Sequence, residues 1–463
     1  MKQDNIDIQK ILTTKRVIEG LNNDVFNRRY KTNFSKISDY FYHEFNIRSS
    51  VLNRACLEFI HRGREKTSKR VKLFNCLSGS TLFCFVVVIF MAFLRRFTYI
   101  KGNPSANGES MSKFALIDRS NRFLYGDFLK DREGASLVKD FSRGFFHKQV
   151  RFNLCSVIKL FSDVRSGCVV AKSLDREQKM FFLEKIIECT MVKRFYDSIG
   201  SFDYIVDCQD NSYTPVQKEI ANILDIDLIL LQNGARVNLL EYGYIDCNIF
   251  LGWSNLYKRI VVGEVLCDIF LAIGSKSMSR QTRRETCKEY DFLIVEQLTY
   301  PDKGEASDAS KHKAMIGKMI EFKKKHPQYR IVYLCRHTRT QLKEKIQSIL
   351  LDNDTVLLEN DIEILDRNFC ECAVKNSKVS IALSSSIRFE SYLVGNVGFS
   401  VFDRESIFDW VQQLFNKNSA SLRDTQEDFD RKLLQSLKSD INLNNIFNNS
   451  SYSLSEALEK LKT

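Results

Sequence analysis

Proline is scarce in this chain, with 4 residues among 463, against roughly 5% in an average protein. The scarcity excludes collagen-like and proline-rich chains and favours compact elements joined by short loops. Aromatic residues are not scarce, at 12%, and they bury enough apolar surface to exclude a fully disordered chain. The length predicts about three domains of roughly 150 residues each.

Several short motifs that carry chemistry are absent. The sequence has no Walker phosphate loop, GxGxxG fingerprint, HExxH or GxSxG, which weakens interpretations as a nucleotide hydrolase, dehydrogenase, metalloprotease or serine hydrolase. The six histidines are dispersed and the thirteen cysteines include no CxxC, so we expect no metal site. Scattered cysteines in odd number are typical of a reducing compartment. The first 20 residues are polar and mixed in charge, unlike a signal peptide, so we expect the catalytic part in the cytoplasm.

The basic excess of the chain is concentrated at its start. The net charge is +12, and residues 1–72 alone carry 16 basic and 8 acidic residues, a local surplus of +8. A nucleic-acid-binding protein more often shows a basic stripe with aromatic residues across its folded domain. Here the surplus adjoins an apolar segment, which indicates an anionic membrane surface as a partner and no nucleic acid.

The first 100 residues divide into a basic helical region, 1–72, and an apolar segment, 73–100. Apolar residues recur at helical spacing through the first region. The second region starts with 22 residues without a charge, 73–94, followed by Arg95 and Arg96, and about 20 apolar residues suffice to cross a bilayer. Both flanks are basic, so the positive-inside rule gives no orientation. We favour an anchor that returns to the cytoplasmic face; a single membrane span and a buried core helix are the alternatives.

Short apolar runs alternate with helical stretches after residue 112, as in βαβ units with buried parallel strands. We expect two consecutive units, 112–255 and 256–416, followed by C-terminal helices in 417–463. Ligands bind beyond the carboxyl ends of the strands in such sheets. The polar residues at the predicted strand ends are Asp118 and Arg119, Asp207 to Asp210, Gln232 to Gly234, Glu296 and Gln297, Arg336 to Arg339, and Ser384 to Ser386.

Smaller expectations concern the second unit and the end of the chain. A helix over 340–351 and a short strand over 356–358 are predicted before the strand that ends at Ser384. Two residue pairs have capping-box spacing and predict the C-terminal helices, namely Asp424 with Glu427 and Ser453 with Glu456.

Five short pieces of the sequence resemble the GT-B glycosyltransferase fold, and within it the bacterial proteins of surface-carbohydrate (capsule and lipopolysaccharide) biosynthesis. They are Ala115–Ser120, Leu230–Gly234, Ala272–Ser275, Arg336–His337, and Ser384–Ser386 with Glu390. The last two are also similar to elements of bacterial sialyltransferases, Kdo transferases and teichoic-acid glycerophosphotransferases. The sequence departs from these patterns where Thr338 stands in place of proline and Asn233 in place of histidine. The resemblance implies an α/β protein with two Rossmann-like domains facing a cleft, preceded by the helical, membrane-associating N-terminal region.

The second unit is expected to hold the donor nucleotide. Ser384, Ser385 and Ser386 precede an amphipathic helical stretch, and such a turn offers hydroxyls and free backbone N–H groups to a phosphate. Plain N-capping without a ligand is the alternative. As in similar GT-B enzymes, Glu390 is expected to accept hydrogen bonds from the ribose hydroxyls; an exposed helical acid is the alternative.

Charged residues after the neighbouring strand complete the expected donor site. His337 is a candidate to donate a hydrogen bond to the leaving phosphate, with Arg336 and Arg339 neutralising its charge. A structural cap is the alternative role for the histidine, and a solvated basic loop is the alternative for the arginines.

The first unit is expected to hold the acceptor and its base. Asp207 and Asp210 follow a strand and are the best-placed carboxylates for deprotonating an acceptor hydroxyl; the start of a turn is the alternative role for either. The remaining candidates on the acceptor side are Asp118 and Arg119, and the predicted tight turn of Gln232, Asn233 and Gly234, where Asn and Gly are also favoured by turn geometry alone.

Together these features predict a membrane-associated, GT-B-like glycosyltransferase at the cytoplasmic face of the inner membrane. It is expected to move a sugar from a nucleotide-sugar donor, CMP-linked sugars included, to a surface polysaccharide or a lipid-linked acceptor. An aspartate is the expected base, and no cofactor or metal is needed because the donor-site groups carry the phosphate charge. A glycerophosphotransferase of the teichoic-acid type and a catalytically inactive GT-B-like scaffold are the alternatives.

Overall fold

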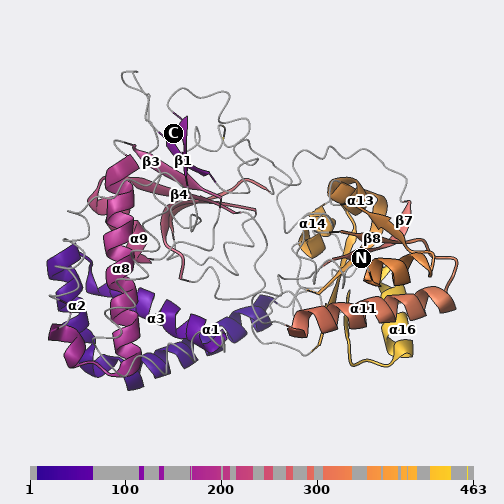
Figure 1. The fold of residues 1–463 in the computed structure, drawn as a ribbon, viewed down its shortest axis with the longest axis horizontal. Helices are drawn as coiled ribbons and strands as arrows, with labels where there is room; N and C mark the ends of the chain where they lie inside the picture. Colours follow the sequence, from indigo (N-terminus) through magenta and orange to yellow (C-terminus); the bar gives the residue numbers. More distant parts are fainter. Residues whose placement is uncertain are drawn as a thin grey trace.

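The structure is a computed structural model, and Figure 1 shows two lobes that each contain a β-sheet. The residues that it describes are 8–65, 114–118, 135–139, 167, 169–199, 202–208, 215–232, 244–253, 267–274, 289–296, 306–335, 352–366, 369–383, 387–393, 395–403, 418–439 and 456.

The first lobe is built on a parallel sheet with the strand order β2-β1-β3-β4-β5-β6. Its strands are β1 Phe114–Asp118, β2 Ala135–Lys139, β3 Tyr204–Asp207, β4 Asp227–Leu231, β5 Cys247–Gly252 and β6 Cys267–Ala272. The strands β3, β4 and β5 are almost entirely buried, which explains why their sequences are nearly continuous apolar runs.

The second lobe contains a second parallel sheet, with the order β12-β11-β10-β7-β8-β9. Its strands are β7 Tyr290–Val295, β8 Ile331–Leu334, β9 Glu363–Leu365, β10 Ser377–Ala382, β11 Val397–Phe402 and β12 Ser419–Ser421. The predicted α/β class and the pair of Rossmann-like sheets of a GT-B-like fold are confirmed.

The limits of the two units differ from the expected ones. Strand β6 pairs with β5, so the first unit continues past residue 255 and includes at least 267–272. Strand β12 pairs with β11, so the second unit extends beyond residue 416. The predicted strand at 356–358 was wrong, because residues 352–358 form a helix that buries Leu357 in the core; the strand that follows β8 is β9.

Helices cover both faces of the second sheet. On one face, α11 (Ala306–Lys325) packs Met315, Met319 and Phe322 into the cluster that contains Phe292 and Ile294 of β7. On the other face, α13 (Cys370–Asn376) and the start of α14 (Ile387–Leu393) pack against residues of β7 and β8.

Three N-terminal helices occupy most of the stretch that we expected to be helical. They are α1 Ile8–Arg29, α2 Lys31–Phe45 and α3 Ser49–Glu65. Figure 1 places them beside α8 (Arg176–Ile199) and α9 (Pro215–Ile223) in the first lobe. One buried cluster unites these elements, with Phe41 and Leu52 packed among Phe181, Phe182 and Ile220. The N-terminal helices are therefore part of the first lobe and not a separate domain.

Charge pairs also hold the N-terminal helices to the first lobe. The Arg48 guanidinium donates to both carboxylate oxygens of Glu219 on α9, at 2.6 and 2.7 Å. Arg54 of α3 donates to Asp246 at 2.8 Å, beside the first residue of β5. Paired arginine–carboxylate bonds of this kind fix the orientation of the two elements they join.

Within the ranges given above, no helix is both long and apolar enough to span a bilayer. The apolar segment 73–94 lies outside the described residues, so the membrane anchor stays a prediction.

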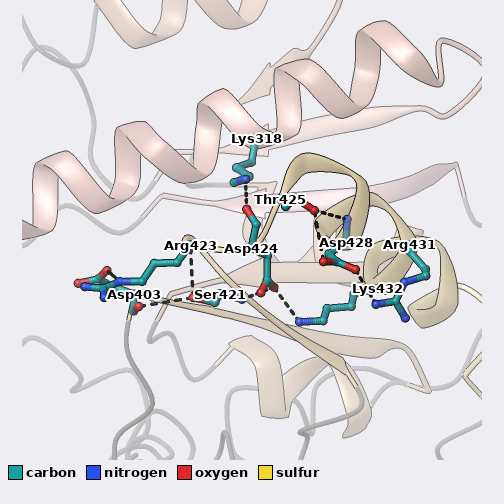
Figure 2. Close-up of polar contacts among 9 residues, drawn as sticks. All are labelled: Lys318, Asp403, Ser421, Arg423, Asp424, Thr425, Asp428, Arg431 and Lys432. Atoms are coloured by element: carbon teal, nitrogen blue, oxygen red, sulfur yellow. Dashed lines mark hydrogen bonds and ion pairs between the residues drawn. The ribbon is translucent and has the colours of Figure 1, made fainter.

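The last described helix, α16 (Gln426–Ser436), begins one residue later than the capping-box spacing predicted. Its N-cap is Thr425, whose hydroxyl oxygen accepts from the backbone N–H of Asp428 at 3.2 Å. Asp424 instead accepts from Lys432 at 2.7 Å, and its carbonyl accepts from Lys318 of α11 at 2.6 Å (Figure 2). These bonds attach the C-terminal helix to α11, and thus to the second lobe.

Helix α14 lies unusually close to strand β11. A Cβ atom added to Gly398 of β11 would stand 2.1 Å from the carbonyl oxygen of Arg388. The Arg388 side chain, itself completely buried, donates to the Ser400 hydroxyl at 2.5 Å. Glycine at 398 therefore permits the backbone approach that sets α14 on the sheet.

We expect Gly398→Ala to lower the free energy of unfolding by about 1–3 kcal/mol, because the added methyl group forces α14 away from β11. Gly317→Ala in α11 is the matched control: its added Cβ meets nothing within 4 Å, and alanine is the better helix former by up to about 1 kcal/mol. Urea unfolding of both variants measures the difference. Equal stability of the two variants would contradict the close approach.

Candidate functional site

The strand order places one topological switch point in each sheet. In the first sheet, β1 has β2 on one side and β3 to β6 on the other. In the second sheet, β7 has β8 and β9 on one side and β10 to β12 on the other. Ligands of open α/β sheets bind beyond the carboxyl ends of the strands at such points, because the connecting chains leave in opposite directions and open a crevice. The candidate site residues are therefore those after β1, β3, β7 and β10.

Asp118 and Asp207 lie at the first switch point. Asp118 is the last residue of β1 and Asp207 is the last residue of β3. The register pairs Leu116 with Val206, so the two aspartates end neighbouring strands within about one residue of the same level. The register makes Asp118 level with Cys208 and not with Asp207, so the two aspartates end adjacent strands at positions of opposite facing. Their roles in a site stay predictions.

The Asp207 carboxylate points to the helix-covered face of the sheet and has no exposed surface. It alternates along β3 with Val206 and shares the face of Ile205, which packs in the cluster of α8. Burial, and then the negative charges of Asp207 and Glu188, raise the pKa of the Tyr196 phenol on α8 well above its usual value. Asp207 is therefore close to Tyr196, beneath α8.

Gln232 has a structural partner at the end of β4. Its side-chain oxygen accepts from the backbone N–H of Trp253 at 2.7 Å, and its carbonyl accepts from the Trp253 indole N–H at 3.3 Å. Both residues are buried. Gln232 thus ties the end of β4 to the end of β5, a role that the prediction of a cleft-facing turn did not include.

Glu296 and Leu383 stand at the second switch point. The backbone N–H of Glu296 donates to Leu334 of β8 at 3.0 Å. The register pairs Ile294 with Ile381 of β10, so Glu296 is level with Leu383, and Ser384 follows next. Glu296 has no exposed surface. The sequence identified Glu296 only as one of several strand-end residues. What distinguishes it is that it follows β7, the strand at which the order of the sheet reverses.

Glu390 lies on α14, which starts at Ile387, directly after the predicted serine turn. Its exposed fraction is 9%, so the alternative of an exposed helical acid is wrong. The completely buried Arg388 and the bond to Ser400 hold this helix in place.

Ten predicted site residues lie outside the described part of the chain, and their roles stay predictions. They are Arg119, Asp210, Asn233, Gly234, Arg336, His337, Arg339, Ser384, Ser385 and Ser386. Among the residues that the structure describes, no group of three or more His, Cys, Asp or Glu side chains is arranged to hold a metal ion.

Comparisons with known proteins identify similar folds but no family. No family model and no curated protein matches the chain. A solved UDP-GlcNAc 2-epimerase from Neisseria meningitidis, bound to UDP-GlcNAc, is 12% identical, with 76% of this chain and 100% of that chain covered and a TM-score of 0.45. The S. aureus MnaA–UDP structure is 10% identical, with 75% and 94% covered and a TM-score of 0.45. The pneumococcal O-GlcNAc transferase GtfA, in complex with UDP and GlcNAc, is 13% identical, with 59% and 58% covered and a TM-score of 0.32.

The hydrogen bonds between Gln232 and Trp253 are expected to stabilise the fold at the end of β4. We expect Gln232→Ala to lower the free energy of unfolding by about 1–3 kcal/mol, because a buried backbone N–H loses its acceptor. Gln435→Ala on the exposed side of α16 is the control and should change stability by about 0.5 kcal/mol or less. Urea unfolding at matched pH checks both values; an equally small loss for Gln232→Ala would show that the bond is dispensable.

Proposed function

We propose that this protein is a GT-B-like glycosyltransferase that moves a sugar from a nucleotide-sugar donor to a surface polysaccharide or a lipid-linked acceptor. The observation that carries the proposal is the pair of Rossmann-like sheets in one chain, each with a carboxylate at its switch point. Such a chain offers two ligand crevices, and a transferase needs one for the donor and one for the acceptor.

The proposed donor site belongs to the second sheet. The serine turn Ser384–Ser386 would cradle the nucleotide phosphates, and Glu390, one turn into α14, would accept from the ribose. His337, Arg336 and Arg339 would neutralise the leaving phosphate. The burial of Glu390 supports this proposal, since a carboxylate held out of bulk water makes stronger hydrogen bonds to a ligand hydroxyl.

The proposed acceptor site belongs to the first sheet. Asp207 and Asp210 are the candidate bases, and Asp118 is the carboxylate at the neighbouring strand end. A base must come within hydrogen-bond reach of the acceptor hydroxyl. Asp207 is completely buried, so it serves as base only if acceptor binding opens the cover above it.

The proposed location is the cytoplasmic face of the inner membrane. Helix α3 ends at Glu65, and the basic stretch and the apolar segment 73–94 follow it in the sequence. Basic residues next to an apolar segment favour an anionic lipid surface. An anchor at this position would hold the first lobe, and with it the acceptor site, near lipid-linked acceptors.

Nucleotide binding is the first test of this function. We expect one of CMP, CDP, UDP, GDP or their sugars, UDP-GlcNAc included, to raise the melting temperature of the wild-type protein. A ligand at 100 times its dissociation constant stabilises by about 2.7 kcal/mol. The same ligand should shift His337→Ala much less, because the phosphate loses a donor. No shift from any member of the panel would favour the inactive scaffold.

Transfer from the nucleotide sugar identified in this way tests the base. We expect either Asp207→Asn or Asp210→Asn to reduce transfer to a membrane lipid extract by about 100-fold or more, with donor binding unchanged. Asp203→Asn, an exposed aspartate just before β3, is the control and should keep full activity. Full activity in all three variants would place the base elsewhere. Transfer of glycerol phosphate from a CDP-linked donor to the acceptor, with release of CMP, would instead identify the glycerophosphotransferase.

A further inference from the structure

We propose that the outer face of helix α1 is a membrane-contact surface that lies on anionic lipid headgroups. The α1 face comprises six exposed residues, namely Arg16, Val17, Gly20, Leu21, Asp24 and Arg28. The inference rests on the proposed membrane location and assigns that location a surface on the folded part of the chain. It does not depend on the transfer reaction.

The α1 face points away from the rest of the first lobe. The opposite side of the helix is buried: Ile18 lies in the core, and the Asn22 side chain donates to the Tyr244 hydroxyl at 2.8 Å. Helix α1 contacts α2 and α3, while α3 contacts α9, which in turn packs on β4 and β5. Helix α1 is therefore the outermost layer on this side of the sheet and lies at the edge of the lobe (Figure 1).

Two large apolar side chains lie together in the α1 face. Val17 is 54% exposed and Leu21 is 42% exposed, and residues four apart are neighbours on a helix surface. A Cβ atom added to Gly20 beside them would meet nothing within 4 Å, so the surroundings of the pair are open. A single exposed apolar residue is ordinary on a soluble surface, but this pair has cations on both sides.

The cations are Arg16 and Arg28, at the two ends of the α1 face. Apolar side chains between cations are typical of helices that lie in a membrane interface. There the apolar groups enter the headgroup layer, and the cations meet the lipid phosphates. The same face carries one acid, Asp24, so the two arginines outnumber it.

Further cationic residues extend this surface beyond the end of α1. Residues 28–31 and 172–179 together carry six basic and two acidic residues, a local surplus of +4. The two segments meet where Arg29 donates to Glu177 at 2.6 Å. The other acid, Asp175, accepts from a backbone N–H in the first turn of α8 at 2.9 Å. A surplus of this kind attracts an anionic surface.

The chain leaves α3 beside the other end of the α1 face. Two shared aromatic contacts give the relative direction of the helices: Asn22 and His61 meet at Tyr244, and Tyr30 and Phe59 meet at Phe181. Helix α3 therefore runs antiparallel to α1 and ends at Glu65 beside its first half. In the sequence, residues 62–72 then carry six basic residues and one acid, and the uncharged segment 73–94 follows. The predicted anchor thus follows directly on the edge of the lobe that carries the α1 face.

A lipid surface is the partner that fits both parts of the α1 face. A nucleic acid would match the arginines but would leave Val17 and Leu21 without an apolar partner. A second copy of the chain would match the apolar pair but would bring two cationic surfaces together. Anionic lipid supplies the phosphates and the apolar layer at once.

A tryptophan probe in the full-length protein tests the contact. Gly20→Trp places the probe in the α1 face, and Gly317→Trp on α11 is the matched control, because both glycines are exposed and an added Cβ meets nothing within 4 Å at either one. The protein is bound to vesicles of brominated phosphatidylglycerol, of brominated phosphatidylcholine, or of the unbrominated lipids. Bromine quenches tryptophan fluorescence only at short range. The signal of the two native tryptophans is measured in wild type and subtracted.

We expect brominated phosphatidylglycerol to quench at least half of the Gly20→Trp signal and to leave the Gly317→Trp signal unchanged. Adding Arg16→Gln and Arg28→Gln should weaken the association of the α1 face with the lipid surface about fivefold for each arginine removed, so that most of the quenching is lost. Lys313→Gln with Lys324→Gln, at two exposed positions of α11, is the matched charge control and should leave the quenching unchanged.

Other outcomes overturn the inference in different ways. Equal quenching of the two probes, or none of the Gly20→Trp signal, would show that the α1 face does not contact lipid. Equal quenching in phosphatidylcholine, or full quenching without the two arginines, would show that anionic headgroups are not recognised. A blue shift of the Gly20→Trp emission without vesicles would identify a second copy of the chain if it grows with protein concentration, and a nucleic acid if it requires added RNA. Nucleotide binding is measured without vesicles, so failure of the proposed function is seen separately.

Discussion

Each sheet buries one carboxylate at the point where its strand order reverses, and the surrounding layers have to compensate the charge. Asp207 lies under α8 near Tyr196, and Glu296 lies on the α11 side, where Tyr333 and His312 are bonded to each other. An ionised carboxylate loses most of its hydration in such a place, which is costly in a medium of low polarity. Both helix–sheet layers therefore become polar toward the strand ends, while the rest of each core is aliphatic and aromatic.

Much of the fold could be predicted from the sequence, because buried parallel strands form short apolar runs with polar residues at their ends. Strand β6 was assigned to the wrong unit, because the expected boundary at residue 255 precedes it, whereas it pairs with β5 at the edge of the first sheet. Its residues Asp268 and Ile269 are exposed, so it lacks the pattern of a fully buried strand. The Val-Leu-Leu run at 356–358 was taken for a strand because three apolar residues do not distinguish a strand from a turn of helix. In the structure these residues are helical, and the helix packs Leu357 into the core.

The site was accessible only in part, for a related reason. The sequence can show that a residue lies at the end of a strand, but it does not show which residue of the neighbouring strand lies beside it. Gln232 illustrates this limit: its partner Trp253 is 21 residues away, and only the register of β4 against β5 brings them together. Glu296 meets the same limit, since its place at the switch point depends on which strand is central, and strand order is a property of the sheet and not of any segment.

Helices α1, α2 and α3 leave the ribosome long before the surfaces that cover them. Arg54 and its partner Asp246 are 192 residues apart, a length that takes about 10–40 s to synthesise at 5–20 residues per second. For the larger part of this time Phe41 and Leu52 lack their partners on α8 and α9, which begin only at Arg176 and Pro215. The nascent chain thus exposes apolar side chains of the helical bundle that become covered only when the later elements of the first lobe have been synthesised.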